Sequence, residues 1–218
     1  LATTQAVVSL LDERTKAPSE RDPSIMSAPS MFQIATIVGD TLREVISSLR
    51  HEGPEASAPF RASLILGGQI AGSEPRLFLI YPEGNFIEAG DDSPFFQIGE
   101  TKYGRPIIVR TFDPAMTFED ATRLLMVSFD STIRSNLAVD LPLDLATYER
   151  DACKLAHQQR IEVNDPYFRR ISEQWSLKTC GSRGRSTRQT CPRWPIVASA
   201  RSSATAPMAR NPASPAGQ

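Results

Sequence analysis

The sequence has few of the residues on which most hydrolytic and metal sites depend. Its 218 residues include two histidines and three cysteines. Two histidines leave almost no material for a Ser-His-Asp triad. Cys153, Cys180 and Cys191 fit no zinc-ligand spacing, and their odd number argues against a disulfide framework. We therefore expect a cytoplasmic protein with no metal site and no cofactor.

Long hydrophobic runs and a targeting signal are also lacking. No apolar stretch approaches the ~20 residues that a membrane span requires. The first residues carry no basic region of the kind that opens a signal peptide. A membrane is therefore not expected among the partners.

Acidic residues are missing from one part of the chain. Residues 177–218 contain seven Lys and Arg and no Asp or Glu, whereas the other 176 residues contain 17 basic and 25 acidic ones. Ala, Ser, Pro and Gly make up half of residues 177–218, a composition that does not bury a core. We therefore expect one domain over residues 1–176 and a disordered basic tail over residues 177–218. Because the composition switches inside a helical pattern, a shifted reading frame near residue 177 is favoured over a natural tail for an anionic partner.

Two helices are predicted in the first quarter of the chain. Thr3 or Thr4 is expected to cap a first helix, whose apolar residues end near position 11. Ser30 and Gln33 form a capping box for a second helix, which the pair Gly53-Pro54 ends.

Residues 60–99 then predict four short β-runs joined by tight turns. Pro82–Asn85 and Gly90–Ser93 have the composition of turns, and Gly99 closes the fourth run. Both faces of the first run are apolar or small, so we expect it to be covered on both sides.

The second half of the domain alternates again between helix and strand patterns. A short helix is predicted over residues 102–112, and a strong helix capped by Thr117 follows it to residue 132. Residues 141–148 predict a strand that pairs with residues 157–163, and a last helix opens at Pro166. The order of elements predicts an α+β fold, a four-layer α-β-β-α sandwich.

Five short sequence motifs stand out by their order and spacing. They are LeuAlaThrThrGln at 1–5, LeuPheLeuIleTyrProGluGlyAsn at 77–85, GlnIleGlyGlu at 97–100, TyrGlyArgPro at 103–106 and ArgSerAsnLeu…LeuProLeuAspLeu across 134–145. Together they resemble the bacterial proteasome-type peptidases of the ancestral β-subunit type, over roughly residues 1–176. The resemblance implies an N-terminal-nucleophile hydrolase sandwich with its opening strands missing. It also implies like subunits in a ring, peptide or unfolded protein substrates, and no nucleic acid.

The same resemblance implies that this chain lacks its nucleophile. In the family, the first residue of the mature chain is a Thr, Ser or Cys that attacks the peptide bond, and its own α-amine serves as base. That residue and its Lys and Asp partners precede the segment that matches residues 1–5. Thr3 and Thr4 lie within that matching segment, so they do not replace the nucleophile. We therefore expect a truncated peptidase subunit that is inactive as written, with a non-catalytic ring or scaffold subunit as the alternative.

Some supporting positions of the site are present. Gly99, Glu100 and Thr101 lie where proteasome subunits carry a Gly-Ser turn near the nucleophile. Ser135 lies at or next to the Asp position of an AspXaaXaaSer support loop, and Ala138 lies at its Ser position. Asp140, where this branch tends to have Gly, puts the geometry of that loop in question.

Other candidate sites have simpler explanations. Cys153 and His157 could form a thiol–imidazole dyad only if their side chains lay on the same face. Because they are four residues apart in a segment that joins two strands, we do not expect them to share a face. Gly67-Gly68 would suit the approach of a peptide backbone or a simple packing contact. Asp91-Asp92 is expected to be a solvated turn, and the arginines of residues 183–188 lack the interleaved aromatics of a nucleic-acid site.

Overall fold

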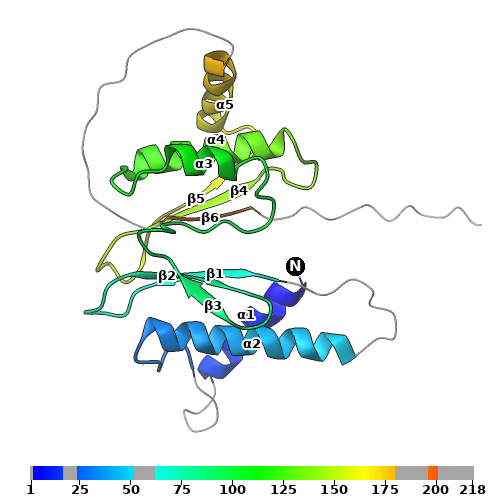
Figure 1. The fold of residues 1–218 in the computed structure, drawn as a ribbon, viewed down its shortest axis with the longest axis vertical. Coiled ribbons are helices and arrows are strands. Elements are labelled where there is room, and N and C mark those ends of the chain that lie inside the picture. Colours follow the sequence, from blue (N-terminus) through cyan, green and yellow to red (C-terminus); the bar gives the residue numbers. More distant parts are fainter. Residues whose placement is uncertain (1, 17–23, 52–61, 180–195, 201–218) are drawn as a thin grey trace, which may run out of the picture.

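The computed structural model describes residues 2–16, 24–51, 62–179 and 196–200. These residues stack in four layers (Figure 1). Helices α1 (Ala2–Lys16) and α2 (Met31–His51) cover a sheet of β1 (Leu64–Gly68), β2 (Arg76–Ile80) and β3 (Phe86–Glu88). The second sheet contains β4 (Leu143–Tyr148), β5 (Leu155–Ile161) and β6 (Ile196–Ala200), and it lies under α3 (Arg105–Thr111) and α4 (Phe118–Ile133). Helix α5 (Pro166–Thr179) projects beyond α4. The predicted α-β-β-α sandwich is confirmed.

The first sheet is an antiparallel meander in the order β1-β2-β3. The predicted turn at Pro82–Asn85 joins β2 to β3, and Tyr81 N donates to the Asn85 carbonyl at 2.8 Å. The predicted turn at Gly90–Ser93 is also present, closed by hydrogen bonds in both directions. The fourth predicted strand is wrong, because residues 94–99 form no ladder. Instead Phe95 packs on Phe112 of the α3 end, with ring centroids 5.4 Å apart.

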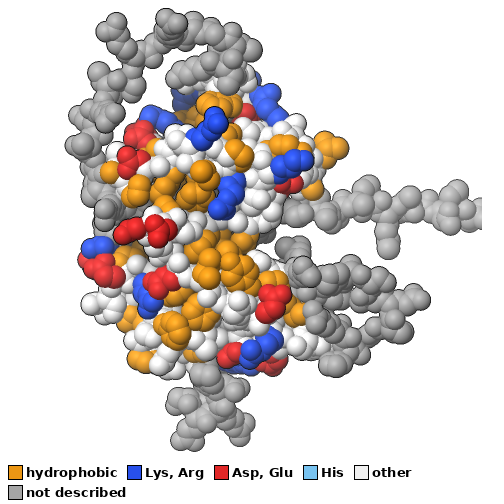
Figure 2. Space-filling view, viewed as in Figure 1, with side chains coloured by type: hydrophobic (Ala, Val, Ile, Leu, Met, Phe, Trp, Pro, Cys, Tyr) orange, Lys and Arg blue, Asp and Glu red, His pale blue; other side chains and the backbone are white. Residues whose placement is uncertain are grey.

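The core of the first two layers lies between α2 and one face of this sheet. Leu42 of α2 and Phe78 and Ile80 of β2 are fully buried there. The opposite face is less well covered, since Ile65 and Leu79 are only half-buried. Figure 2 shows hydrophobic side chains gathered in the middle of one face of the molecule, with charged side chains around them. In β1 itself, Leu64 and Leu66 on the helix side are half-buried as well, so the expected covering of this strand is incomplete on both faces.

The helix caps are confirmed for α2 and wrong for α1. Ser30 Oγ accepts from Gln33 N at 3.2 Å, which is one of the two hydrogen bonds of a capping box. Helix α1 begins at Ala2, so Thr3 and Thr4 lie inside its first turn, and Thr3 is buried. Residues 52–61, where the second helix was expected to stop, lie outside the described residues.

Helix α4 is buried on two sides. Thr117 caps it as predicted, because its hydroxyl accepts from Asp120 N at 3.0 Å. The predicted stripe includes Ala121 and Ser128, which are buried. Met126 and Asp130 are buried as well and lie on a second stripe that the sequence pattern did not predict. Met126 packs on Leu143 and Leu145 of β4, among other residues.

The second sheet contains the predicted hairpin of β4 and β5, although β5 starts at Leu155. Within the part of the chain predicted to be a disordered tail, Ile196–Ala200 pair with β4 as β6. The open edge of β4 offers backbone hydrogen bonds that tail composition cannot reveal. Helix α5 continues to Thr179, past the expected boundary at residue 176. The division of the chain into domain and tail stays a prediction.

The two sheets are joined at one end through the side chain of Gln69, which follows β1. Its Oε1 accepts from Tyr148 Oη at 2.9 Å and from Asp151 N at 2.7 Å. Its Nε2 donates to Ser73 O and to Asp151 Oδ1, both at 2.6 Å. Arg150 also pairs with Glu74. We call these contacts the inter-sheet clamp.

Among the described helices, none is long and apolar enough to cross a membrane.

Candidate functional site

The segment Gly99–Thr101 forms a tight turn directly before α3. Gly99 has φ of +80°, a left-handed conformation that glycine adopts without strain. The carboxylate of Glu100 then folds back, and its Oε1 accepts from Lys102 N at 2.7 Å. Thr101 O accepts from Arg105 N at 3.1 Å, which begins α3. The turn is therefore fixed by hydrogen bonds on both sides of Glu100.

The packing of α3 against α4 fixes the position of this turn. Gly104 is buried at the start of α3, and a Cβ atom there would lie 2.3 Å from Ser128 Oγ and 2.9 Å from Thr132 Oγ1. The two helices approach each other closely only because residue 104 has no side chain. The turn at Gly99–Thr101 is thus held against the helix that leads into the support loop.

The support loop, residues 134–140, leaves the C-terminal end of α4. Asn136 organises it, because its Oδ1 accepts from Ala138 N at 2.9 Å and its own N–H donates to Thr132 O at 2.8 Å. Arg134 anchors the loop to both neighbouring helices, with Asp130 Oδ1 at 3.1 Å and Ser172 Oγ at 2.6 Å. Ser135 and Ala138 are both exposed.

The two supporting segments meet through one hydrogen bond. Asn136 Nδ2 donates to Glu100 Oε2 at 2.8 Å, in a partly buried setting. The structure therefore brings the predicted turn and the predicted loop together. The side chain that reaches across is Asn136, not its neighbour Ser135. Asn136 was not among the residues predicted from the sequence, although Asn readily bonds the backbone of its own loop.

Gln97 adds an unsatisfied acceptor to this region. Its Nε2 donates to Glu100 O at 3.3 Å. Its Oε1 is buried and, within the described part of the chain, has no hydrogen-bond partner. Leaving a buried polar atom unpaired is energetically costly.

The other candidates do not form sites. Cys153 is exposed in the β4–β5 connection; burial and the Cys153 thiol raise the pKa of Tyr148. His157 lies on β5 opposite Thr147, and a ring nitrogen is 3.4 Å from Gln159 Oε1. A Cβ at Gly68 would lie 3.2 Å from Met31 Cε, as a packing contact requires.

No metal site was expected, and Asp91 and Asp92 lie in the exposed turn after β3. Within the described residues, no three His, Cys, Asp or Glu side chains gather closely enough to hold a metal ion. The tail arginines of residues 183–188 lie outside the described residues.

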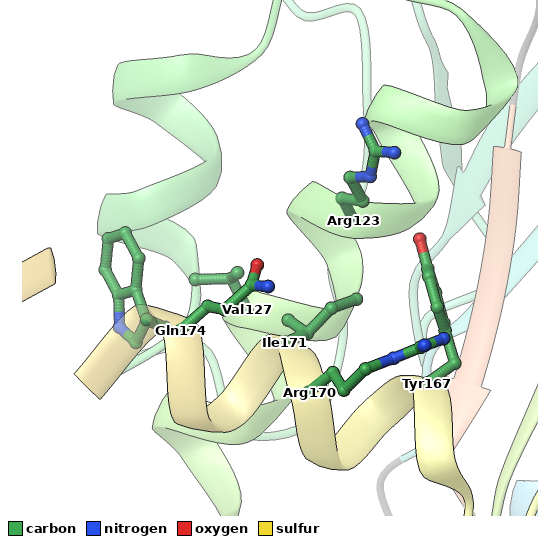
Figure 3. Close-up of a pocket in the computed structure, with 7 residues that line it drawn as sticks. Arg123, Val127, Tyr167, Arg170, Ile171 and Gln174 are labelled. Carbon is green, nitrogen blue, oxygen red and sulfur yellow. The ribbon is translucent and has the colours of Figure 1, made fainter. Parts of the chain in front are cut away.

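A cavity of about 460 Å³ lies between α4 and α5 (Figure 3). Arg123, Tyr167, Arg170 and Ile171 are among its lining residues. The hydroxyl end of Tyr167 points toward Arg123, and its hydrogen bond raises the pKa of that guanidinium. Arg123 also pairs with Glu119 on its own helix. The ion pair with Glu119 therefore partly neutralises the positive charge of Arg123 at this cavity. None of the predicted site residues lines the cavity.

Comparison with known proteins identifies the family. No family model and no curated protein matches the sequence. Among solved structures, the Gly-1 mutant of Anbu from Hyphomicrobium sp. strain MC1 is 47% identical with a TM-score of 0.74, over 83% of this chain and 74% of that one.

Two further relatives cover 83% of this chain and 73% of their own, each with a TM-score of 0.75. They are Anbu, the ancestral beta-subunit, from Yersinia bercovieri at 44% identity, and Anbu from Pseudomonas aeruginosa, solved as a helical assembly of its complex, at 43%. The chain belongs to the Anbu family of proteasome β-subunit-like proteins, as the five short sequence motifs predicted.

Proposed function

We propose that this chain provides the supporting half of a peptidase site whose nucleophile is an N-terminal Thr, Ser or Cys. The observation that carries the proposal is the Asn136–Glu100 hydrogen bond. It joins the two segments that the family resemblance assigns to the site, although they lie 36 residues apart. The substrate class is a peptide or an unfolded protein, and the reaction is peptide-bond hydrolysis.

The supporting role consists of fixing backbone and orienting polar groups. Glu100 and Asn136 lock the turn and the loop to each other, and Arg134 ties the loop to α4 and α5. A nucleophile placed beside such a rigid pair keeps its amine and its side chain in one geometry. Ala138 has no hydroxyl to offer, so this loop supports a nucleophile through Asn136 and its backbone.

No residue of the sequence matches the nucleophile or its Lys and Asp partners. We therefore expect the 218-residue polypeptide by itself to hydrolyse nothing. The assay is turnover of a fluorogenic peptide by the purified chain. Turnover that an N-terminal-nucleophile inhibitor blocks would contradict this expectation.

A chimera tests the supporting role directly. The part of the Hyphomicrobium relative that precedes its match to Leu1 is fused in front of this chain, with a processed N-terminal nucleophile. We expect the chimera to hydrolyse the peptide, and its nucleophile-to-Ala variant to be inactive. A folded chimera without activity would show that residues 97–140 do not support catalysis here.

We also propose that the chain assembles with copies of itself, as the Pseudomonas relative does. Exposed apolar side chains such as Val109 and Leu137, which are 60% and 102% exposed, suit contacts between subunits. Small-angle scattering would show a defined oligomer larger than the monomer. A monodisperse monomer would contradict this part of the proposal.

A further inference from the structure

The side chain of Gln97 is held in a fixed place beside the Gly99–Thr101 turn. Gln97 follows Phe95, whose ring packs on Phe112 and fastens this part of the chain to the end of α3. The Nε2 of Gln97 then donates to Glu100 O at 3.3 Å. The side chain is therefore anchored twice, through the packing of its own segment and through its amide.

The hydrogen bond to Glu100 also determines which end of the amide is which. A carbonyl oxygen only accepts, so the amide nitrogen of Gln97 faces Glu100 O and the amide oxygen is directed elsewhere. With the amide turned over, two oxygens would face each other at 3.3 Å without a hydrogen between them. The oxygen that remains, Oε1, is buried and has no partner within the described part of the chain.

The donors that fix Glu100 are already used. Lys102 N donates to Glu100 Oε1, and Asn136 Nδ2 donates to Glu100 Oε2. Neither of these groups is therefore free to bond Gln97 Oε1. Since buried acceptors in folded proteins are nearly always paired, this one suits an N–H group that another segment brings to the turn.

We propose that Gln97 is a positioning residue of the peptidase site, and that its Oε1 accepts a hydrogen bond from an N–H group of the segment that bears the nucleophile. The inference rests on the proposed function, because only a peptidase site brings such a segment to this turn. One amide then ties the segment to Glu100, which Asn136 locks to the support loop. Fixing the nucleophile in this way favours the chemical step and leaves substrate binding nearly unchanged.

Gln97→Met tests the hydrogen bond, because Met has a similar length and lacks the amide. In this chain alone, the lost bond to Glu100 is offset by the loss of an unpaired buried oxygen, so the urea midpoint should shift little. In the chimera described above, the variant also leaves the new donor unpaired, so the midpoint should fall clearly further. Gln158→Met, which changes an exposed glutamine of β5, is the matched control and should shift neither midpoint.

Peptide hydrolysis by the chimera provides a second readout. We expect Gln97→Met to lower kcat about tenfold, the effect of one lost hydrogen bond, with KM nearly unchanged. Gln97→Glu keeps an acceptor oxygen but sets a second oxygen against Glu100 O. This variant should therefore be less stable than Gln97→Met in the chain alone, and yet have the higher kcat in the chimera. A purely structural role would make kcat follow stability, so the reversed order is specific to positioning.

Three results would overturn the inference and leave the proposed function standing. They are equal midpoint shifts of Gln97→Met in the chain and in the chimera, an unchanged kcat in an active chimera, and values of kcat that follow stability. A solvent molecule as the donor would give the first of these results. A folded chimera without activity would instead overturn the proposed function, and the positioning role with it.

Discussion

The inter-sheet clamp allows a sharp test of how the two sheets are held together. In Gln69→Glu, the Nε2 donor becomes a carboxylate oxygen that faces Ser73 O and Asp151 Oδ1, which it contacts at 2.6 Å in the wild type. Each lost hydrogen bond contributes roughly 0.5–1.5 kcal/mol. Repulsion between two carboxylates at a surface adds on the order of 1 kcal/mol. We expect the free energy of unfolding to fall by about 2–4 kcal/mol at pH 7.

Asp151→Asn is the matched control. Asp151 has φ of +65°, and Asn tolerates this left-handed conformation as well as Asp does. Its amide oxygen still accepts from Gln69, so we expect a change within about 0.5 kcal/mol. In the double variant, the new amide donates to the introduced carboxylate and should recover about half of the Gln69→Glu loss.

The assay is urea unfolding of the four proteins, which form a double-mutant cycle. A coupling near zero, with the double variant no more stable than Gln69→Glu, would refute the clamp geometry. Repulsion raises the pKa of the introduced carboxyl group above its ordinary value of about 4.3. The loss in Gln69→Glu should therefore shrink as pH falls toward about 4, because the group gains a proton and becomes a donor.

Three further predictions concern stability. Gly104→Ala should lower the free energy of unfolding by about 1–3 kcal/mol in urea, because its Cβ would lie 2.3 Å from a serine oxygen of α4; Gly90→Ala, with open space around it, should change little. Asn136→Asp should replace the bond to Glu100 by repulsion and speed hydrogen exchange in residues 134–140, and the added change Glu100→Gln should restore protection. The hydrogen bond from its arginine partner on β2 holds the pKa of Glu88 below its ordinary value of 4.5, so this stabilisation is present above pH 4.5 and is lost as pH falls through the lowered pKa. Thermal melts of Glu88→Gln from pH 7 to pH 3 should lack this part of the acid sensitivity, at most about 1 kcal/mol for an exposed pair.

The elements that the sequence predicted well are those fixed by local chemistry. The hydroxyl groups of Ser30 and Thr117 accept hydrogen bonds from backbone N–H groups three residues ahead. A short sequence motif therefore determines each helix start. The hairpin turn at Pro82–Asn85 follows in the same way. The strand predicted at residues 94–99 fails because its apolar residues pack on α3 through Phe95 and find no ladder partner. Apolar alternation indicates a half-buried extended segment and does not establish a partner strand.

What the sequence could not predict depends on contacts between distant segments. Met126 and Asp130 are buried because α4 has neighbours on two sides, whereas a single helical stripe predicts one buried face. Gln69 meets Tyr148 across 79 residues, and Asn136 meets Glu100 across 36. The short motifs of the family resemblance indicated which segments to propose for the site. They did not indicate which side chain would join them, since a turn residue bonds its own backbone as readily as a neighbour.

The hydrogen bonds of this region fit the supporting role that we propose. Glu100 and Asn136 use both ends of their side chains, each bonding its own segment and the other. Buried polar atoms in folded proteins nearly always have a hydrogen-bond partner. Gln97, which holds the Glu100 carbonyl, does not follow this rule, since its buried Oε1 has no partner among the described residues. Leaving that acceptor unpaired costs about 1–3 kcal/mol. The supporting role that we propose therefore predicts that a donor brought beside Glu100 by a nucleophile-bearing segment would remove this cost.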